Sequence, residues 1–419
     1  MTTLRARILL VAYACRPGES SEREVGWRWA NLIQANHDVT VLTRKTHQPF
    51  IEAEVARRED NTPIPEFIYY DLPSWATWFK QGERGLYLYY VLWSLFAIRL
   101  MRRLNTNGRW EITHFLTFGT LLWPQFTWLT NTPFYVLGPV GGGERIPMRL
   151  RASFGLSGQV KIAVRWAVQK AQAANPIFNA TLARADKIFV RTRETYDLIP
   201  AHHRHKTDLL LETAVSPNML KKHPPLREND CFEIVSVGRL ITSKFNPLFL
   251  ESLAAFKALW NRPFRVTIIG DGPERVRLEN LRDKLGLNEV IFVGKQASEE
   301  VFATLHRSDL YFSTTMKEGG TWAFFEAIAC GVPIVCLKVN GPDMIVGDGC
   351  GIKVTPSNHI AAREALANGL FQMASDPTLR AYYAEQARAW VEQNYTWMHV
   401  AEQIDSTYTK ILQNEEPRS

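Results

Sequence analysis

Cysteine is scarce in this sequence, and the few cysteines are poorly spaced for cross-linking or for zinc binding. Five occur among 419 residues, an odd number, and no two of them are separated by only two residues. A disulfide framework and a Cys-x-x-Cys zinc site are therefore not expected, and a reducing, cytoplasmic environment is predicted. Tandem repeats and low-complexity tracts are also missing, so the composition indicates ordinary globular domains.

Long apolar runs free of charge are missing too. Residues 86–104, LYLYYVLWSLFAIRLMRRL, are strongly apolar, but Arg99 interrupts them, so the segment is too short and too charged to span a bilayer. One interpretation is a helix at a membrane surface, with Arg99, Arg102 and Arg103 near lipid headgroups. The other is a core helix of the first domain, which the lack of a polar face favours.

The N-terminus only superficially resembles an export signal. Arg5 and Arg7 precede an apolar run at residues 8–15 of minimum length, and the bulky Tyr13 lies where a cleavage site needs a small residue. A buried first strand explains the run equally well. We therefore predict a cytoplasmic protein, with peripheral contact at the inner face of the cytoplasmic membrane if 86–104 lies at a surface.

The positive charge of the chain is concentrated in its first half. The formal net charge is +7, and residues 1–213 contain 27 Lys/Arg against 18 Asp/Glu, a net of +9. Such an excess favours an acidic partner through long-range attraction. No nucleic-acid-binding motif is present, so nucleic acid is not an expected partner, whereas an anionic membrane or a phosphate-bearing substrate is.

A chain of 419 residues is too long for a single hydrophobic core, so two domains are expected. Short apolar runs alternate with helical patterns in both halves, which predicts parallel βαβ units in an α/β fold. In such folds ligands bind at the carboxyl ends of the strands. The predicted boundaries are a first domain at 1–213, a Pro- and Lys-rich hinge at 214–231, a second domain at 232–395, and a C-terminal helix at 396–414 that crosses back to the first domain.

Two carboxylates eight positions apart, Glu318 and Glu326, form the strongest motif. Glu318 is predicted to follow a strand, and Glu326 to lie within the next helix. Gly319 and Gly320 would let the backbone approach a ligand, and the helix start would offer N–H groups to phosphate. A carboxylate on that helix could accept hydrogen bonds from a ribose diol. An incidental acidic residue at a helix start is the alternative that spacing alone leaves open.

The second half resembles the retaining glycosyltransferases of family 4, the glycosyl transferases group 1. The resemblance covers most of that half and rests on four landmarks, namely residues 318–335 (EGGTWAFFEAIACGVPIV), 237–240 (VGRL) with Lys244, 269–273 (IGDGP) and 292–295 (FVGK). It implies the GT-B fold, in which two Rossmann-like domains face each other across an interdomain cleft. The first half resembles one bacterial branch of the family through residues 138–144 (GPVGGGE) and His114.

The resemblance also implies roles for individual residues. Arg239 and Lys244 would bind the donor diphosphate and stabilise the charge of the leaving group, in place of a metal. Glu318 would contact the donor sugar, and Glu326 the ribose. No Asp-x-Asp occurs, in keeping with an enzyme that needs no metal or cofactor beyond its UDP- or GDP-linked sugar. The remaining donor-binding positions are Gly270, Val293, Lys295, Gly319, Gly320, Thr321 and Trp322.

In the first domain, His114 resembles the family's active-site histidine, which faces the donor sugar. A lone histidine in an apolar strand is often only a satisfied core residue, and this alternative stays open. Gly141, Gly142 and Gly143 follow a strand and would form an acceptor-side loop, or merely a turn.

One position departs from the family pattern. Thr321 stands where a glycine is usual, which adds bulk near the sugar and leaves the donor's identity undetermined. The predicted function is retaining transfer of a hexose from a nucleotide sugar to a saccharide or lipid-linked saccharide, in bacterial cell-surface or exopolysaccharide assembly. The alternatives are a nucleotide-sugar epimerase of the same architecture and a non-catalytic sugar-nucleotide-binding relative.

Overall fold

The computed structural model describes residues 5–18, 22–59, 62–80, 85–220 and 231–413. These residues form two compact units. Unit 1 comprises the described parts of 1–143, 167–212 and 398–419, and unit 2 comprises those of 144–166 and 213–397. Each unit is built around one parallel β-sheet.

Unit 1 contains a seven-stranded parallel sheet of order β3-β2-β1-β4-β5-β6-β7. Its strands are β1 Arg7–Ala12, β2 Asp38–Thr43, β3 Glu66–Tyr69, β4 Ile112–Thr117, β5 Phe134–Val140, β6 Lys187–Val190 and β7 Thr207–Leu209. Because all are parallel, their carboxyl ends lie along one edge of the sheet, which is the edge where ligands bind in folds of this kind.

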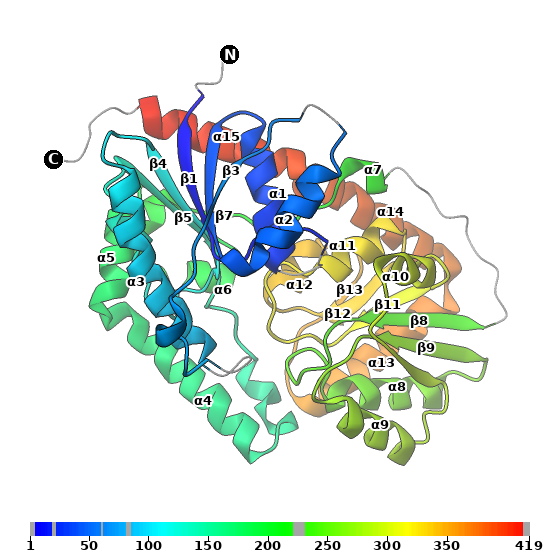
Figure 1. Cartoon of the computed structure of the whole chain (residues 1–419). Coiled ribbons are helices and arrows are strands. Elements are labelled where there is room, and N and C mark those ends of the chain that lie inside the picture. Colours follow the sequence, from blue (N-terminus) through cyan, green and yellow to red (C-terminus); the bar gives the residue numbers. More distant parts are fainter. Residues whose placement is uncertain (1–4, 19–21, 60–61, 81–84, 221–230, 414–419) are drawn as a thin grey trace. The chain divides into compact units, whose positions relative to one another are not determined.

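The helices of unit 1 connect these strands, and Figure 1 shows them flanking the sheet. They are α1 Glu22–Gln34, α2 Gln48–Ala56, α3 Leu86–Leu104, α5 Pro176–Arg184, α6 Arg193–Tyr196 and α15 Trp397–Gln413. One further helix, α4 Leu156–Ala171, begins in unit 2 and ends in unit 1.

Alternate residues of β4 point to opposite faces of the sheet, as the pleat requires. Phe115 lies in the core that α3 covers, together with Tyr90 and Trp93. His114 points to the other face, where its ring contacts Trp29 of α1 and Tyr408 of α15. Both faces of the sheet are therefore buried, and this is why its strands are almost continuously apolar.

The C-terminal helix α15 packs on unit 1, which confirms the prediction from its apolar spacing. Val400, Ile404 and Tyr408 are buried at four-residue intervals. Asp405, on the same helix, lies 3.1 Å from the imidazole of His37.

Helix α3 has two apolar faces. One face is buried in the core of unit 1 and contains Tyr89, Tyr90 and Trp93, together with the buried residues in the later turns of the helix. The opposite face exposes Leu88 and Phe96 to solvent. The core interpretation is thus correct for one face, and the other face is still available for a partner.

Unit 2 contains a six-stranded parallel sheet of order β10-β9-β8-β11-β12-β13. Its strands are β8 Phe232–Val237, β9 Phe264–Ile269, β10 Val290–Gly294, β11 Leu310–Ser313, β12 Ile334–Leu337 and β13 Ile352–Val354. Its helices fall into two groups, and each helix contacts at least one other helix of its own group (Figure 1). One group is α8 Pro247–Leu259, α9 Arg275–Lys284 and α13 His359–Ser375; the other is α7 Pro217–Leu220, α10 Ser298–Leu305, α11 Trp322–Ala329, α12 Asn340–Ile345 and α14 Pro377–Asn394.

Several helices begin where their sequences provide a cap. The side chain of Asn358 accepts a hydrogen bond from the backbone at the start of α13, and Asp376 does the same for α14. Asn175 caps α5 through two backbone N–H groups. Such caps satisfy N–H groups that the helix itself leaves unpaired, each contributing about 1 kcal/mol.

The segment 144–166 lies in unit 2, although the chain reaches it from β5 of unit 1. Leu150 and Phe154 are buried in the core of unit 2. The side-chain amide of Asn340 also exchanges two hydrogen bonds with the backbone of Arg145, at 3.1 and 3.2 Å. The boundary expected at 213 and the hinge at 214–231 stay predictions, because most of that hinge lies outside the described residues.

Two parallel sheets, each flanked by helices, are the Rossmann-like architecture. The predicted α/β fold with two such domains is confirmed.

Candidate functional site

The predicted donor-site residues of unit 2 lie on loops at one edge of its sheet. Arg239 and Lys244 follow β8, Gly270 follows β9, and Lys295 follows β10. Glu318 and Glu326 lie beyond β11, in the loop and in α11 respectively. Since the strands are parallel, these loops all emerge from the carboxyl edge, and β10, β9, β8 and β11 are consecutive neighbours there.

The loops after β8 and β9 approach each other so closely that glycine is required. Gly270 has a φ of +139°, and a Cβ built on it would lie 2.0 Å from the carbonyl oxygen of Gly238. The backbone N–H of Gly270 donates to Gly294 at the end of β10, at 2.8 Å. The glycine predicted for the donor site therefore joins three loops through backbone contacts.

Two hydrogen bonds tie the loop after β8 to the loop after β11. The N–H of Met316 donates to the carbonyl of Ser243 at 2.8 Å, and the side-chain amide of Asn246 donates to the carbonyl of Thr314 at 3.1 Å. These bonds hold the backbone on either side of Lys244 close to the segment that precedes Glu318.

The result is direct contact between two of the predicted site residues. Nζ of Lys244 lies 3.2 Å from Oε1 of Glu318, and the two side chains are 25% and 20% exposed. An ion pair with this partial burial is screened less than a fully exposed surface pair. Arg239, on the same loop as Lys244, is exposed.

The loop that carries Glu318 is supported from behind by Gly341. The N–H of Gly341 donates to the carbonyl of Glu318 at 3.0 Å, and a Cβ on Gly341 would lie 1.7 Å from the carbonyl oxygen of Gly319. Only glycine fits at this position. The amide of the preceding Asn340 also donates to the carbonyl of Met316 at 2.8 Å, so α12 fixes the loop at two points.

Glu326 occupies a different environment from Glu318. It lies within α11, and burial raises the pKa of its carboxyl group to about 7. No hydrogen bond to its side chain is found among the described residues. A carboxylate that is largely desolvated and unpaired gains most from a ligand that donates hydrogen bonds to it, such as a vicinal diol.

Thr321 lies at the N-cap of α11 and is 7% exposed. Its hydroxyl is buried, and none of the described residues provides it with a hydrogen-bond partner. Gly319 and Gly320 precede it, and Trp322 follows it at the first position of the helix. The start of α11 thus places an unpaired hydroxyl beside the first turn of the helix.

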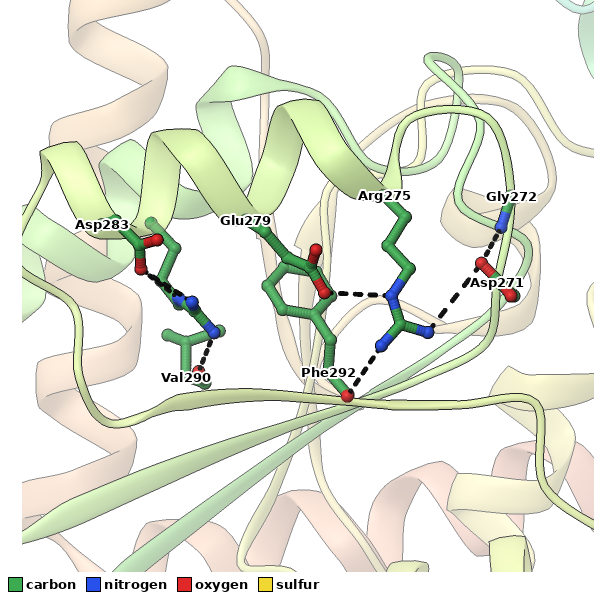
Figure 2. Close-up of polar contacts among 8 residues, drawn as sticks. Asp271, Gly272, Arg275, Glu279, Asp283, Val290 and Phe292 are labelled. Atoms are coloured by element: carbon green, nitrogen blue, oxygen red, sulfur yellow. Dashed lines mark hydrogen bonds and ion pairs between the residues drawn. The ribbon is translucent and has the colours of Figure 1, made fainter.

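The segment predicted to contact the nucleobase is held by Arg275, as Figure 2 shows. Its guanidinium donates to Glu279 at 2.9 Å and to the carbonyl of Phe292 at 3.3 Å, and lies 4.0 Å from Asp271. Arg275 therefore connects the loop after β9 to the last residues of β10. Val293 follows Phe292 and is partly exposed, and the side chain of Gln296 donates to its carbonyl at 3.3 Å.

Lys317 is a candidate site residue that the motif comparison did not identify. It directly precedes Glu318, and burial, reinforced by nearby Arg165, lowers the pKa of its amine. Its carboxylate neighbours Glu144 and Glu318 act in the opposite direction. The only signal in the sequence was a cation adjacent to the motif, which spacing cannot distinguish from a solvated lysine.

The structure places His114 in the interior of unit 1. It is fully buried, its Nδ1 lies 2.5 Å from the hydroxyl of Tyr408, and its Nε2 lies 2.6 Å from the carbonyl of Gly138. Burial lowers the pKa of this imidazole to about 4. Both ring nitrogens are engaged within the unit, so the geometry favours the core alternative over a role facing the donor sugar.

The predicted acceptor-side loop is also buried. Gly141 pairs with the backbone at Gly119, and Gly142 accepts a hydrogen bond from the side chain of Gln169 at 2.6 Å. A Cβ on Gly143 would lie 2.2 Å from the carbonyl oxygen of Glu194. Close packing within unit 1 is enough to explain these glycines, which favours the turn alternative.

Within the residues that the structure describes, no group of three or more His, Cys, Asp or Glu side chains is arranged to hold a metal ion. Over the same residues, no helix combines the length and apolarity needed to cross a bilayer.

Comparison with known proteins places a family match on unit 2. Residues 220–390 match the family described as glycosyl transferases group 1. One component of the human phosphatidylinositol N-acetylglucosaminyltransferase is 26% identical over 230 residues, which cover 52% of this chain and 46% of that protein. The N-acetyl-alpha-D-glucosaminyl L-malate synthase of Bacillus anthracis is 28% identical over 153 residues, covering 36% and 39%. The chain thus spans less than half the length of these curated relatives.

Solved structures extend the likeness in fold to nearly the whole chain. A glycosyltransferase from Rickettsia africae has a TM-score of 0.67 at 16% identity, over 98% of this chain and all of that one. Anabaena HepE, in complex with UDP and glucose, has a TM-score of 0.61 at 16% identity, over 97% of this chain and all of that one.

Proposed function

We propose that this protein transfers a sugar from a nucleotide diphosphate sugar to a hydroxyl acceptor, with retention at the anomeric carbon, because residues 220–390 match the glycosyl transferases group 1. The observation that carries the proposal is the contact between Lys244 and Glu318 at the carboxyl edge of the sheet in unit 2. A cation for the diphosphate and an acid for the sugar are the two chemistries that donor binding and activation need.

The ion pair suggests how the donor engages the site. Lys244 is paired with Glu318, and a diphosphate would provide a stronger anionic partner for its ammonium. Lys244 and Arg239 would then stabilise the charge that develops on the departing phosphate. Glu318, released from the lysine, could accept hydrogen bonds from hydroxyls of the donor sugar.

Glu326 suits the ribose of the donor. Its carboxyl group is desolvated and has no hydrogen-bond partner among the described residues, as stated above. Two ribose hydroxyls would supply the donors that the ionised form lacks, and so favour that form on binding. The HepE structure, which holds UDP on a similar fold, supports a uridine or other nucleoside diphosphate as the ligand class.

The proposal is tested by hydrolysis of a panel of UDP- and GDP-sugars without any acceptor, comparing wild type with Lys244→Ala. Slow hydrolysis of one donor that is lost in the variant supports glycosyl transfer. Tight donor binding without turnover would instead indicate a sugar-nucleotide-binding protein, and recovery of an epimerised sugar would indicate an epimerase. The matched control is Lys284→Ala, because Lys284 is an exposed lysine at the end of α9 in the same unit.

Helix α3 would contact a membrane surface, and a saccharide acceptor would reach the protein at that surface. The free face of this helix exposes Leu88, Leu95 and Phe96, and its last two turns carry the exposed Arg99 and Arg102. An apolar face that ends in cations matches the boundary between acyl chains and anionic headgroups.

Flotation with vesicles that contain anionic lipid tests this membrane contact. Changing the exposed Arg99, Arg102 and Arg103 to Glu should abolish flotation. Vesicles without anionic lipid should bind neither the wild type nor this variant. A control with the same change of charge replaces three exposed cations elsewhere, Lys45, Arg57 and Lys284. Equal flotation of the two variants would contradict a role for α3.

A further inference from the structure

The carboxyl edge of the sheet in unit 1 carries a row of polar and aromatic side chains. Tyr13, Arg44 and Phe118 each directly follow a strand, namely β1, β2 and β4, and Asp71 lies two residues beyond β3. The sheet order β3-β2-β1-β4 therefore places Asp71, Arg44, Tyr13 and Phe118 side by side in that sequence. This is the edge at which parallel α/β sheets bind ligands.

A hydrogen-bonded pair occupies one end of the row. Nε of Arg44 donates to Oδ1 of Asp71 at 2.8 Å, and the hydroxyl of Tyr89 donates to the same oxygen at 2.7 Å. The guanidinium carbon of Arg44 also lies 4.9 Å from the centroid of the Tyr89 ring. The pair is thus held by several contacts, and its two side chains are 15% and 19% exposed.

The remaining polar atoms of this pair are not used by those contacts. Among the described residues, none forms a hydrogen bond of normal geometry with Nη1 or Nη2 of Arg44, or with Oδ2 of Asp71. The hydroxyl of Tyr13 lies beside the same guanidinium. It is buried and likewise has no hydrogen-bond partner in the part of the chain that the structure describes. Donors of Arg44 and an acceptor oxygen of Asp71 are therefore fixed next to each other on side chains that stay partly exposed.

The other end of the row is an aromatic surface. The rings of Tyr87 and Trp123 stack with centroids 4.6 Å apart and planes 11° apart, and the two residues are 49% and 37% exposed. Phe118 contacts Tyr87 at 5.7 Å and Tyr13 at 5.4 Å, and so connects this surface to the polar pair. Phe118 also has a left-handed backbone, with a φ of +66°, which is uncommon for an aromatic residue.

The net charge of the pair indicates the chemistry of its ligand. Arg44 and Asp71 neutralise each other, and the nearby ammonium of Lys80 lies over the Tyr89 ring, 4.2 Å from its centroid. The carboxylate of Asp71 already occupies the Nε of Arg44, so an anionic ligand would have to share that guanidinium with it. A ligand with many uncharged hydroxyls, by contrast, matches a fixed fork of donors beside an acceptor, and its C–H faces match exposed aromatic rings.

We propose that Arg44, Asp71, Tyr87 and Trp123 form a binding site for the saccharide acceptor. Arg44 and Asp71 bind adjacent hydroxyls of one sugar unit, and the stacked rings of Tyr87 and Trp123 pack against the C–H face of another. The assignment as an acceptor site rests on the proposed glycosyl transfer, whereas the binding of saccharide by these residues does not.

Binding of the full-length protein to an array of immobilised neutral hexose and N-acetylhexosamine oligosaccharides tests the site without requiring turnover. Tyr87→Ala and Trp123→Ala should each weaken the signal about tenfold, because each removes a stacking surface. Asp71→Asn keeps Oδ1 for Arg44 and Tyr89 but loses the charge, and should weaken it by a similar factor. The control is Trp78→Ala, since Trp78 is 81% exposed in the same unit and contacts only Phe79 among the described aromatic rings.

The outcomes separate this inference from the proposed function. Loss of binding in the three site variants but not in Trp78→Ala supports the site. Failure of the wild type to bind any saccharide on the array overturns it, as does equal loss in the control. If the wild type hydrolyses no nucleotide sugar but binds saccharides through these residues, the proposed function fails and the saccharide site stands.

Discussion

Nζ of Lys244 lies 3.2 Å from Oε1 of Glu318, so the cation expected to bind phosphate is paired with the acid expected to bind sugar. The pair joins the loops after β8 and β11, and each group neutralises the other. A nucleotide sugar would divide them, since its diphosphate attracts the lysine and its hydroxyls can donate to the carboxylate.

The first prediction concerns the two halves of this pair. Glu318→Gln should reduce the rate of nucleotide-sugar hydrolysis by about 100-fold, because it removes a charged acceptor beside the reacting sugar. Affinity for the nucleoside diphosphate alone should be unchanged or higher, since Lys244 loses its competing partner. Steady-state kinetics and calorimetric titration measure the two quantities. Equal losses in both would show that Glu318 acts only by maintaining the loop.

Glu326 should make stability depend on pH. Burial raises the pKa of its carboxyl group from its usual 4.5 to about 7. Between these values the folded state retains a proton that the unfolded chain releases, so the contribution of Glu326 to stability falls as pH rises from 4.5 to 7 and is constant above. Glu326→Gln should abolish this decline and raise the free energy of unfolding at pH 8 by about 2 kcal/mol. Urea unfolding at pH 5 and pH 8 measures the difference.

The same carboxyl group should make nucleotide binding depend on pH in the opposite direction. Ribose hydroxyls donate to the ionised form, so affinity for UDP or GDP should increase as pH rises through about 7. In Glu326→Gln the affinity should vary less across this range. A wild-type profile as flat as that of the variant would place the ribose elsewhere.

Thr321 should influence which donor sugar is accepted. Its buried hydroxyl has no partner among the described residues and lies at the start of α11. Thr321→Val keeps the shape and removes the hydroxyl, and should weaken binding of the preferred donor by about 1 kcal/mol if the ligand satisfies that group. Thr321→Ser retains the hydroxyl and serves as the control. Identical donor preference in the two variants would limit Thr321 to a steric role.

His114 should contribute to stability rather than to donor activation. Burial lowers the pKa of its imidazole to about 4, so between pH 6.5 and 4 the unfolded chain takes up a proton that the folded state excludes. The stability should therefore decrease as pH falls from 6.5 to 4, by up to about 3 kcal/mol. The decrease should be smaller in His114→Gln. Part of the slope will remain, because burial also lowers the pKa of His47 to about 4.

A companion variant separates packing from catalysis. Tyr408→Phe removes the hydrogen bond to His114 and should cost about 1 kcal/mol of stability without affecting hydrolysis of the nucleotide sugar at neutral pH. A large loss of hydrolysis in a variant that remains folded would restore a catalytic role for this histidine.

The sequence predicted the fold well wherever hydrophobic patterns are long. The C-terminal helix, predicted at 396–414 from its apolar spacing, appears at Trp397–Gln413, and the expected alternation of strands and helices is found in both halves. Strands β7 and β13 have only three residues each, which is too short for a hydrophobic pattern to predict them.

The candidate site was predictable in its positions but not in its contacts. Motif spacing identified Glu318 and Lys244, yet their pairing depends on hydrogen bonds between loops that no local pattern encodes. His114 could not be assigned from its strand, because Tyr408, which engages it, lies at the other end of the chain. Arg275 was not identified for the same reason, since its importance comes from the loop that it supports.

The most direct test of the central claim is calorimetric titration of UDP and GDP into wild type, Lys244→Ala and the control Lys284→Ala. If unit 2 binds the donor through its diphosphate, one nucleotide should bind the wild type and the control equally, and Lys244→Ala at least about tenfold more weakly. Equal affinity in all three proteins would contradict the assignment.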